Sequence, residues 1–288
     1  MGSTRHGKRD WKGGDRPKGP YGDLYVYLIN GLVAAKNEAG LGETFLGNWV
    51  EEENSFLFFS TPAEEKVGQI LETQPGLELI EDYHFSYEEW QGGSLKPFKI
   101  ADFVIVPPWE RLKDNKEGIH IVLDPGVVFG NGLHPTTRDC LKALSFTARQ
   151  RSFARVLDFG TGTGVLGLAA ALLGAKRVLA VDLNPLCVRT AIENIRLNNL
   201  GEAIEAIEGP AEDFFNEVAD LVVANIHFEV IRNLLESKVP RKTDRFIISG
   251  LMRSQAQEIR SQLAKLSFHL IREWDHEMTW YTILAEKS

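Results

Sequence analysis

The residues best suited to chemistry stand in a glycine-rich turn, Asp158–Gly164, which follows an apolar run and opens a helical one. Glycines let the chain turn tightly and let a ligand approach the backbone, with the helix N-terminus aimed at it. Gly162, Gly164 and Gly167 also fit the dinucleotide spacing G-x-G-x-x-G, which alone is a weak signal. The negative charge of Asp158, just before the first glycine, disfavours a pyrophosphate and suits a cation or an amino group.

Asp182 ends the next strand-like run, about 20 residues beyond the turn. A carboxylate at this place can accept hydrogen bonds from ribose hydroxyls, which fits NAD and S-adenosylmethionine equally well. The structural alternative is a cap for the helix that starts near Asn184-Pro185. S-adenosylmethionine carries an amino group and a sulfonium but no phosphate, so together with Asp158 the pattern favours it as the cofactor.

Two later strand ends carry further polar residues. Asn225 ends a strand-like run at the edge where open α/β sheets bind ligands, and its carbonyl oxygen can orient an amine. Its structural alternative is a helix cap. The adjacent His227 could carry a proton, although a lone histidine at a helix start is more often structural. The loop Glu208–Asp213 offers carboxylates for the adenine side of a pocket; the structural alternative is a capping loop that follows a strand.

A long loop, Leu123–Thr137, precedes the glycine-rich turn and contains three glycines and two prolines among apolar residues. We expect it to fold over the cofactor, with Phe129 as an apolar lid; the structural alternative is a plain turn. Thr136 and Thr137 are predicted to cap a helix that runs to about Ala148.

The elements that must position these residues alternate regularly. Strand-like runs separated by helical runs indicate βαβ units and a parallel sheet. The strand-like runs are 155–159, 178–182, 203–208, 220–224 and 245–249, and the helical runs are 164–174, 185–199, 227–238 and 252–266. The last two runs, Phe268–Trp274 and Thr279–Ala285, are joined by a short turn and must be antiparallel. The sequence predicts an α/β fold: a doubly wound, mostly parallel sheet that ends in an antiparallel hairpin.

The chain divides into four predicted parts. Residues 1–22, rich in Gly, Lys, Arg and Pro, are predicted to be a disordered basic arm. Residues 23–90 are predicted to form a small α+β domain that recognises the substrate, 91–100 a linker, and 101–288 the cofactor-binding domain. Within the small domain we expect a hairpin around an acidic turn, and a helix capped by Thr61.

Composition limits the possible partners. The chain has 32 Lys and Arg residues and 40 Asp and Glu residues. The first 19 residues hold six of the basic and two of the acidic residues. The rest of the chain therefore has 26 basic and 38 acidic residues, a net charge of −12. Such an acidic body is unsuited to an extended nucleic-acid grip and suits a basic protein substrate. The chain has no run of about 18 apolar residues to span a membrane and no apolar secretory signal. We therefore expect a cytoplasmic protein.

No metal site is expected either, because the two cysteines, Cys140 and Cys187, are far apart in the chain.

Taken together, these motifs resemble the PrmA family, the methyltransferases of a large-subunit ribosomal protein, the one numbered eleven. The resemblance is dense over 90–288 and loose before it, and its motifs are Asp124–Thr137, Asp158–Gly164, Asp182 with Asn184-Pro185, Ala224-Asn225-Ile226 and Phe246–Gly250. It implies a class I S-adenosylmethionine-dependent fold and N-methylation of lysine ε-amino groups and an N-terminal α-amine on that ribosomal protein.

The resemblance also assigns roles to residues. It implies a cofactor pocket lined by Phe129, Thr136 and Thr137, a turn formed by Gly160, Gly162 and Gly164, a ribose bound by Asp182, and an amine faced by Asn225. The predicted site comprises these residues and Asp158, with Asn225 as the catalytic residue.

This chain departs from the family at several of these places. Thr161 and Thr163 stand where the family has Cys and Ser, Asn131 and Leu133 stand where it favours Thr, and His227-Phe228 replaces small or aliphatic residues. Three rival functions remain. One is a methyltransferase acting on another protein or on a small molecule. Another is an NAD-dependent dehydrogenase, which would not predict the long loop or the terminal hairpin. The third is a non-catalytic protein that binds S-adenosylmethionine or a nucleotide.

Overall fold

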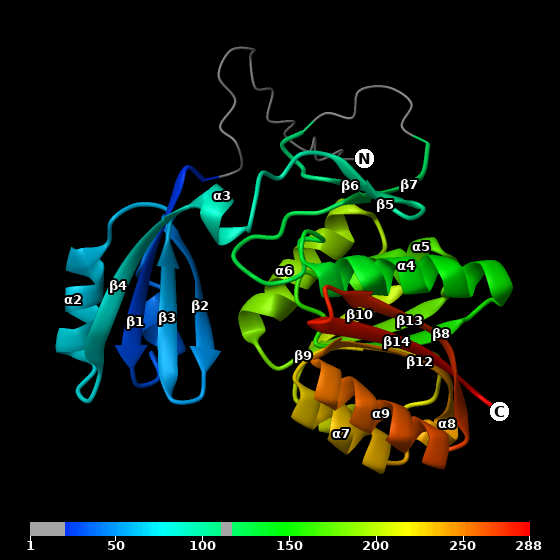
Figure 1. Cartoon of the computed structure of the whole chain (residues 1–288). Helices are drawn as coiled ribbons and strands as arrows, with labels where there is room; N and C mark the ends of the chain where they lie inside the picture. The colour runs from blue at the N-terminus through cyan, green and yellow to red at the C-terminus, as the bar shows by residue number, and fades with distance from the viewer. Residues whose placement is uncertain (1–20, 111–116) are drawn as a thin grey trace, which may run out of the picture.

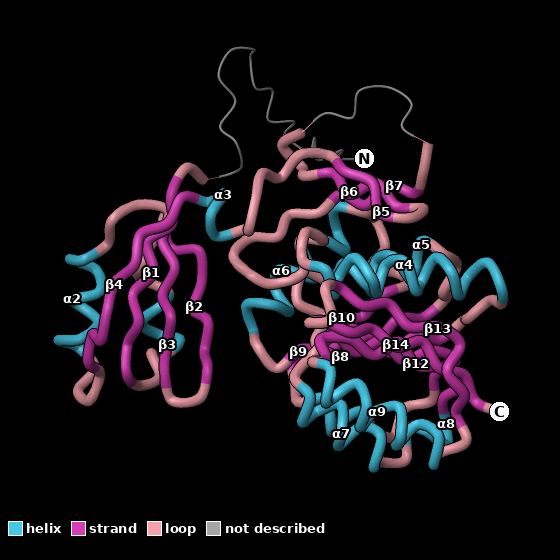
Figure 2. Tube along the Cα trace, viewed as in Figure 1, coloured by secondary structure: helices cyan, strands magenta, loops and turns pink. Residues whose placement is uncertain are grey.

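The computed structural model describes residues 21–110 and 117–288 (Figure 1). Almost all of the predicted basic arm, 1–22, lies outside the described residues. The described chain forms a four-stranded sheet near its start, a three-stranded sheet and a seven-stranded sheet, and Figure 2 shows how helices flank the largest sheet on two sides. The predicted α/β class is confirmed.

The N-terminal sheet has the strand order β2-β3-β1-β4, and its neighbours are antiparallel. Its strands are β1 (Asp23–Asn30), β2 (Phe45–Glu51), β3 (Asn54–Phe59) and β4 (Glu78–Ser86), and its helices are α1 (Ala35–Glu38), α2 (Glu64–Thr73) and α3 (Tyr87–Trp90). The expected hairpin around the acidic turn is confirmed as β2 and β3. Val67 and Ile70 of α2 pack on Leu57 and Phe59 of β3, which closes the core on one face of this sheet.

The predicted start of α2 was wrong. The helix begins at Glu64 with Ala63 as its N-cap, so Thr61 does not cap it. The backbone N–H of Ala63 donates to the buried hydroxyl of Tyr27 on β1, at 2.8 Å. A tertiary hydrogen bond therefore satisfies a helix-start N–H that a local hydroxyl was expected to satisfy.

The three-stranded sheet consists of β5 (Phe98–Ile100), β6 (Phe103–Val106) and β7 (Ile119–Val122). β6 and β7 are parallel, whereas β5 pairs with β6 in the antiparallel sense. β5 lies inside the stretch predicted as a linker, 91–100. Phe103 and Ile121 pack with Leu141 in the same core as the large sheet, so this small sheet belongs to the C-terminal part of the fold.

The large sheet has the strand order β10-β9-β8-β11-β12-β14-β13. Its strands are β8 (Arg155–Phe159), β9 (Arg177–Asp182), β10 (Ile204–Glu208), β11 (Ala219–Asn225), β12 (Thr243–Leu251), β13 (Phe268–His276) and β14 (Trp280–Lys287). The first five run parallel to their neighbours, and β14 is antiparallel to both β12 and β13. The predicted mostly parallel sheet with a terminal hairpin is confirmed.

Two layers of helix cover this sheet (Figure 1). The helices on one face are α4 (Pro135–Gln150), α5 (Val165–Leu172) and α6 (Pro185–Leu197), and those on the other are α7 (Phe228–Glu236), α8 (Val239–Lys242) and α9 (Arg253–Lys265), with a short 3₁₀ turn at Ala211–Phe214. Each face has its own apolar core. Strands buried on both faces are expected to be nearly continuous apolar runs, as the central strands β9 and β11 are.

The position of the site follows from the order of the strands. The chain runs outward from β8 through β9 to β10, and then crosses to β11 on the other side of β8. The strand order reverses between β8 and β11. In open α/β sheets, ligands bind outside the carboxyl ends of the strands at such a switch point.

Candidate active site

The carboxyl ends of three adjacent strands bring the predicted residues together. Asp158 and the glycine-rich turn follow β8, Asp182 ends β9, and Asn225 ends β11. Because β8 pairs with both β9 and β11, these ends lie side by side at one edge of the sheet. The site is therefore assembled by the parallel pairing that the sequence predicted.

The glycine-rich turn is held against the neighbouring strands by its backbone. The N–H groups of Gly160 and Thr161 both donate to the carbonyl of Val181, at 2.9 and 3.1 Å. Gly160 has φ +72°, and a Cβ there would lie 1.8 Å from a methyl carbon of Ile226. A Cβ on Gly162 would lie 2.5 Å from the carbonyl oxygen of Phe129. Glycine is required at both positions because neighbouring segments approach the backbone so closely.

Asp158 lies beneath the turn. Its side chain is fully buried, and its Oδ2 accepts hydrogen bonds from the Thr161 hydroxyl at 2.6 Å and the Gly167 N–H at 3.0 Å. Oδ1 has no hydrogen-bond partner within the described residues. Burial raises the pKa of this carboxyl to about 6, against the opposing effect of the two hydrogen bonds. From this position Asp158 organises the turn and presents no surface to a ligand.

Asp182 stands beside the turn and is only partly buried. Its Oδ2 accepts from the N–H of Gly162 at 2.9 Å, and its Oδ1 accepts from that of Asn184 at 3.0 Å. Burial raises the pKa of the carboxyl, and these hydrogen bonds oppose the shift. The cap of α6 is Asn184, whose Oδ1 accepts from the N–H of Leu186, so the capping alternative for Asp182 is wrong.

One residue at this edge was missed in the sequence. Leu183, next to Asp182, is 70% exposed, an unusual position for a leucine at the end of a buried strand. Its exposed side chain supplies an apolar surface beside the carboxylate, suited to a flat ring. The signal in the sequence was an apolar residue placed immediately after a strand-ending acid.

The start of α4 also differs from the prediction. Its N-cap is His134 and Pro135 is the first helical residue, so Thr136 and Thr137 lie in the first turn and do not cap the helix. Proline suits this first position because its fixed φ matches the helix and its missing N–H would be unpaired there. Both threonines are buried, and within the described chain the hydroxyl of Thr137 has no hydrogen-bond partner.

Thr136 connects the helix start to the sheet edge. Its hydroxyl oxygen accepts from the side-chain N–H of Asn225 at 3.2 Å and lies 2.8 Å from Nδ1 of His134. Burial, and then the nearby His276, lowers the pKa of His134. The other amide atom of Asn225, Oδ1, lies beside Gly250, where a Cβ would come within 3.2 Å of it. The amide is thus fixed by one hydrogen bond and keeps an oxygen that can accept another.

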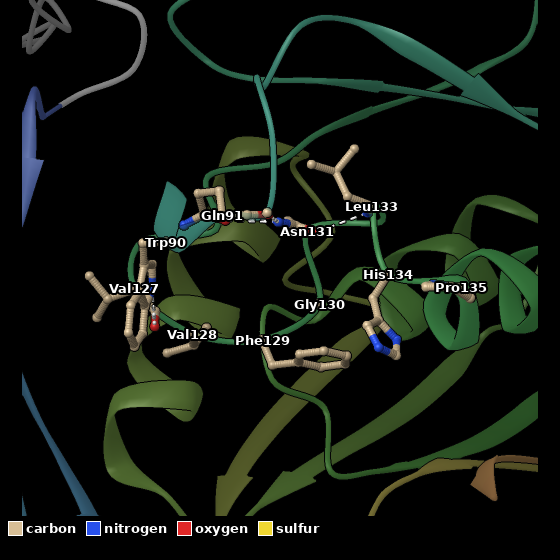
Figure 3. A pocket seen from close by; sticks show the side chains of 11 residues that line it. Trp90, Gln91, Val127, Val128, Phe129, Gly130, Asn131, Leu133, His134 and Pro135 are labelled. Atoms are coloured by element: carbon tan, nitrogen blue, oxygen red, sulfur yellow. Dashed lines mark hydrogen bonds between the residues drawn. The ribbon is translucent and has the colours of Figure 1, made fainter. Parts of the chain in front are cut away.

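The long loop rests directly on the glycine-rich turn. Thr163 donates its N–H to the Phe129 carbonyl at 3.1 Å and its hydroxyl to the Gly130 carbonyl at 2.8 Å. Asn194 of α6 adds two bonds from one amide group, to the carbonyls of Asp124 and Thr163. The Phe129 ring is 49% exposed and meets the His134 ring edge to face, with centroids 5.2 Å apart (Figure 3).

The remaining candidates lie farther from these contacts. His227 is exposed and is the N-cap of α7, with no side-chain capping bond, so Asn225 is not that cap. Glu208 is exposed at the end of β10. Over residues 21–110 and 117–288, no group of three or more His, Cys, Asp or Glu side chains could hold a metal ion.

These features define a Rossmann-like methyltransferase fold. They are an open, mostly parallel sheet with an antiparallel last strand, and a glycine-rich turn and carboxylates at its switch point. Comparison with protein-family models gives a match over residues 49–288 to "Ribosomal protein L11 methyltransferase (PrmA)". The chain belongs to this family.

Relatives of known name agree with the family match. The ribosomal protein L11 methyltransferase of Anoxybacillus flavithermus is 37% identical over 208 residues, which span 70% of this chain and 66% of that protein. The protein of the same name from Clostridium botulinum is 39% identical over 230 residues, which span 77% and 72%. The aligned part is therefore about two thirds of the length of the first relative and somewhat more of the second.

A solved structure supports the fold. The crystal structure of ribosomal protein L11 methylase from Lactobacillus delbrueckii subsp. bulgaricus superposes with a TM-score of 0.56 at 30% identity. The superposition covers 65% of this chain and 94% of that one.

Proposed function

We propose that this protein transfers methyl groups from S-adenosylmethionine to amines of ribosomal protein L11, on lysine side chains, the N-terminus or both. The observation that carries the proposal is the family match over residues 49–288, which includes the whole glycine-rich turn and the ends of β9 and β11. A dehydrogenase is not supported by a match of this extent to methyltransferases.

The residues at the sheet edge fit the proposed cofactor. Asp182 would bind the ribose hydroxyls, since its carboxylate is only partly buried and lies beside the glycine-rich turn, where Oδ2 accepts from Gly162 and Oδ1 from Asn184. Gly160, Gly162 and Gly164 would bring the backbone close to the ligand. The unpaired buried hydroxyl of Thr137 is the kind of group a ligand atom would satisfy.

The chemistry asks little of the protein beyond positioning. Bound S-adenosylmethionine supplies a methyl group on a positively charged sulfur, which is an activated leaving group. Asp182 and the glycine-rich turn would hold the cofactor so that a neutral amine could accept this methyl group and release a proton to water. Asn225 would orient the amine by accepting an N–H at Oδ1.

The amine must be neutral to react, whereas a free lysine has a pKa of about 10.4. Burial against the exposed Phe129 ring and the apolar parts of the loop would lower that value. We assign no side chain as a dedicated base.

The proposal also covers the kind of protein substrate and the place in the cell where the enzyme acts. The net charge of −12 beyond residue 19 suits a basic protein partner. A ribosomal protein substrate would place the enzyme in the cytoplasm. No helix in the described part of the chain is long and apolar enough to cross a membrane.

The proposal is tested by incubating the protein with labelled S-adenosylmethionine and purified L11, followed by mass spectrometry of L11 fragments. Label on lysine side chains or on the N-terminal amine is expected. Label on another ribosomal protein and not on L11 would make this a methyltransferase of different specificity. A protein that binds S-adenosylmethionine and transfers nothing would be a binding protein.

A further inference from the structure

A cavity of about 420 Å³ lies between the end of α3 and the long loop (Figure 3). One wall is formed by Trp90, the last residue of α3, and Gln91, the residue that follows it. The other is formed by Phe129, His134 and their neighbours in the loop. The residues that line the cavity include no Asp, Glu, Lys or Arg, although the chain beyond residue 19 has a net charge of −12.

Both walls are fixed by hydrogen bonds between the two parts of the chain. The indole N–H of Trp90 donates to the Val127 carbonyl at 3.1 Å, and the side-chain amide of Gln91 donates to the Gly126 carbonyl at 2.8 Å. Asn131 donates to both the backbone and side-chain oxygens of Gln91, at 2.8 and 2.9 Å. The cavity therefore exists only when α3 is docked on the loop.

The cavity adjoins the reacting end of the site. Its His134 wall is hydrogen bonded to Thr136, whose hydroxyl accepts from Asn225. The glycine-rich turn is not part of its described lining, and the carbonyls of Phe129 and Gly130 face Thr163 of that turn. Phe129 is thus shared by the cavity and by the loop expected over the cofactor, whereas no described residue of the glycine-rich turn lines the cavity.

We propose that this cavity is an acceptor pocket that receives the side chain of a target lysine. The alkyl stem would lie along Trp90 and Phe129, with the amine directed past His134 toward Asn225. This inference rests on the proposed function, because it names where the substrate of that reaction binds.

The chemistry of the lining fits such a side chain. Aromatic faces attract an alkylammonium group, and tryptophan does so best. A lining without acidic side chains gives the protonated amine no counter-charge, so burial in the cavity favours the neutral nucleophile. An acidic pocket would have held the lysine in its charged, unreactive form.

The kinetic test separates the acceptor from the cofactor. We expect Trp90→Leu to raise the KM for L11 roughly tenfold, while the Kd for S-adenosylhomocysteine, measured by calorimetry, stays within about twofold. Trp90→Phe keeps an aromatic face and loses the indole N–H, so it should restore most of the lost affinity. Trp274→Leu, on β13 far from the cavity in sequence and absent from its lining, is the matched control and should leave the KM unchanged.

Three results would overturn the proposal. One is an unchanged KM in Trp90→Leu. Another is a weakened Kd for S-adenosylhomocysteine with an unchanged KM, which would make the cavity part of the cofactor site. The third is a KM raised equally in Trp90→Leu and Trp90→Phe. This result would point to the hydrogen bond from the Trp90 indole to Val127 and would count against an aromatic acceptor pocket.

A second measurement uses the wild-type protein and needs no catalysis. The indole N–H signal of Trp90, identified by its loss in Trp90→Phe, is followed by NMR while n-butylammonium chloride is added. We expect a saturable shift that sodium chloride at the same ionic strength does not cause; equal shifts with both salts would refute the pocket. If L11 is not methylated but the saturable shift is present, the proposed function fails and the pocket stands.

Discussion

Asp182 supports the site through both of its oxygens, one on the glycine-rich turn and one at the start of α6. We expect Asp182→Ala to weaken S-adenosylhomocysteine binding by at least about tenfold, because the variant would lose the proposed charge-assisted hydrogen bonds to the ribose along with the support of the turn. Isothermal calorimetry measures this. Asp244→Ala, an exposed acid near the start of β12, is the control, and an affinity for Asp182→Ala equal to that of the control would refute the assignment.

Asn225 should matter for turnover more than for cofactor binding, because its hydrogen bond to Thr136 leaves Oδ1 free for the amine. We expect Asn225→Ala to lower the single-turnover rate by about tenfold or more and to change the Kd of S-adenosylhomocysteine by less than about threefold. Rapid-quench single-turnover assays measure the rate. A normal rate in the variant would mean that another group orients the amine.

The buried carboxyl of Asp158 makes stability depend on pH. Its pKa is raised from 3.8 to about 6 in the folded protein, so the folded state holds the proton more tightly than the unfolded state does. The contribution to stability is therefore fully present below about pH 4 and is lost as the pH rises through about 6. The size of this effect is on the order of 3 kcal/mol.

Asp158→Asn tests this, since the amide oxygen can still accept from Thr161 and Gly167 but cannot titrate. Relative to the wild type, the variant should be favoured near pH 7.5 and lose that advantage as the pH falls to 4. Denaturant melts across this range give the difference. A difference in unfolding free energy that is flat with pH would show that Asp158 does not titrate in this window.

The sequence predicted which polar residues share the sheet edge, but not how each one is used. Asp182 and Asn225 come together because they end strands that pair with β8, and strand ends are readable from apolar runs. The burial of Asp158 beneath the turn and the capping of α4 by His134 depend on contacts made only in the folded chain. Cap preferences are local averages that such contacts override.

The long loop is the element that joins the glycine-rich turn to the N-terminal part of the chain. Thr163 holds it from the turn by donating to the Gly130 carbonyl. We expect Thr163→Val, which removes this donor at nearly constant shape, to weaken S-adenosylhomocysteine binding about fivefold, since the loop must then be ordered when the ligand binds.

Thr147→Val is the matched control for this substitution. Thr147 is also a buried threonine, but its hydroxyl donates to a carbonyl within α4 and not to the loop. Both variants should lose a similar amount of stability in thermal melts, and only Thr163→Val should lose ligand affinity. Equal affinities in the two variants would show that the loop needs no support from the turn.

The order of elements was readable, whereas some pairings were not. Regular alternation and a short final turn were enough to predict a parallel sheet with a terminal hairpin. β5 was missed because three residues carry too little periodicity, and it forms only through its pairing with β6. The insertion of the last strand, β14, between β12 and β13 is likewise a long-range pairing that no local pattern encodes.

In the whole molecule, the negative charge is concentrated at one end. Residues 23–90 contain 14 acidic and two basic residues, a net charge of −12, whereas residues 91–288 contain 24 of each. All but one of these 14 acids are exposed. Among the described residues, Asp23 is the only one of the 14 that pairs with a basic side chain, that of His84. The proposed cofactor site thus belongs to the neutral part, residues 91–288, and the negative charge that would attract a basic protein lies on residues 23–90, which form the N-terminal sheet and its helices.

This separation predicts that salt acts on the protein substrate and not on the cofactor. Raising ionic strength from about 0.05 to 0.3 M shortens the screening length from roughly 14 to 6 Å. The kcat/KM for L11 should therefore fall several-fold, because steering by the acidic surface is screened, while the Kd for S-adenosylhomocysteine changes little. Replacing three exposed acids, Glu51 at the end of β2 and Glu52 and Glu53 in the turn that follows, with Gln should reduce both kcat/KM and its slope against salt. The matched control replaces the exposed acids Glu202, Glu205 and Glu217 of the neutral part, and it should leave the slope unchanged. A kcat/KM that is indifferent to salt in the wild type would mean that the acidic end does not meet the substrate.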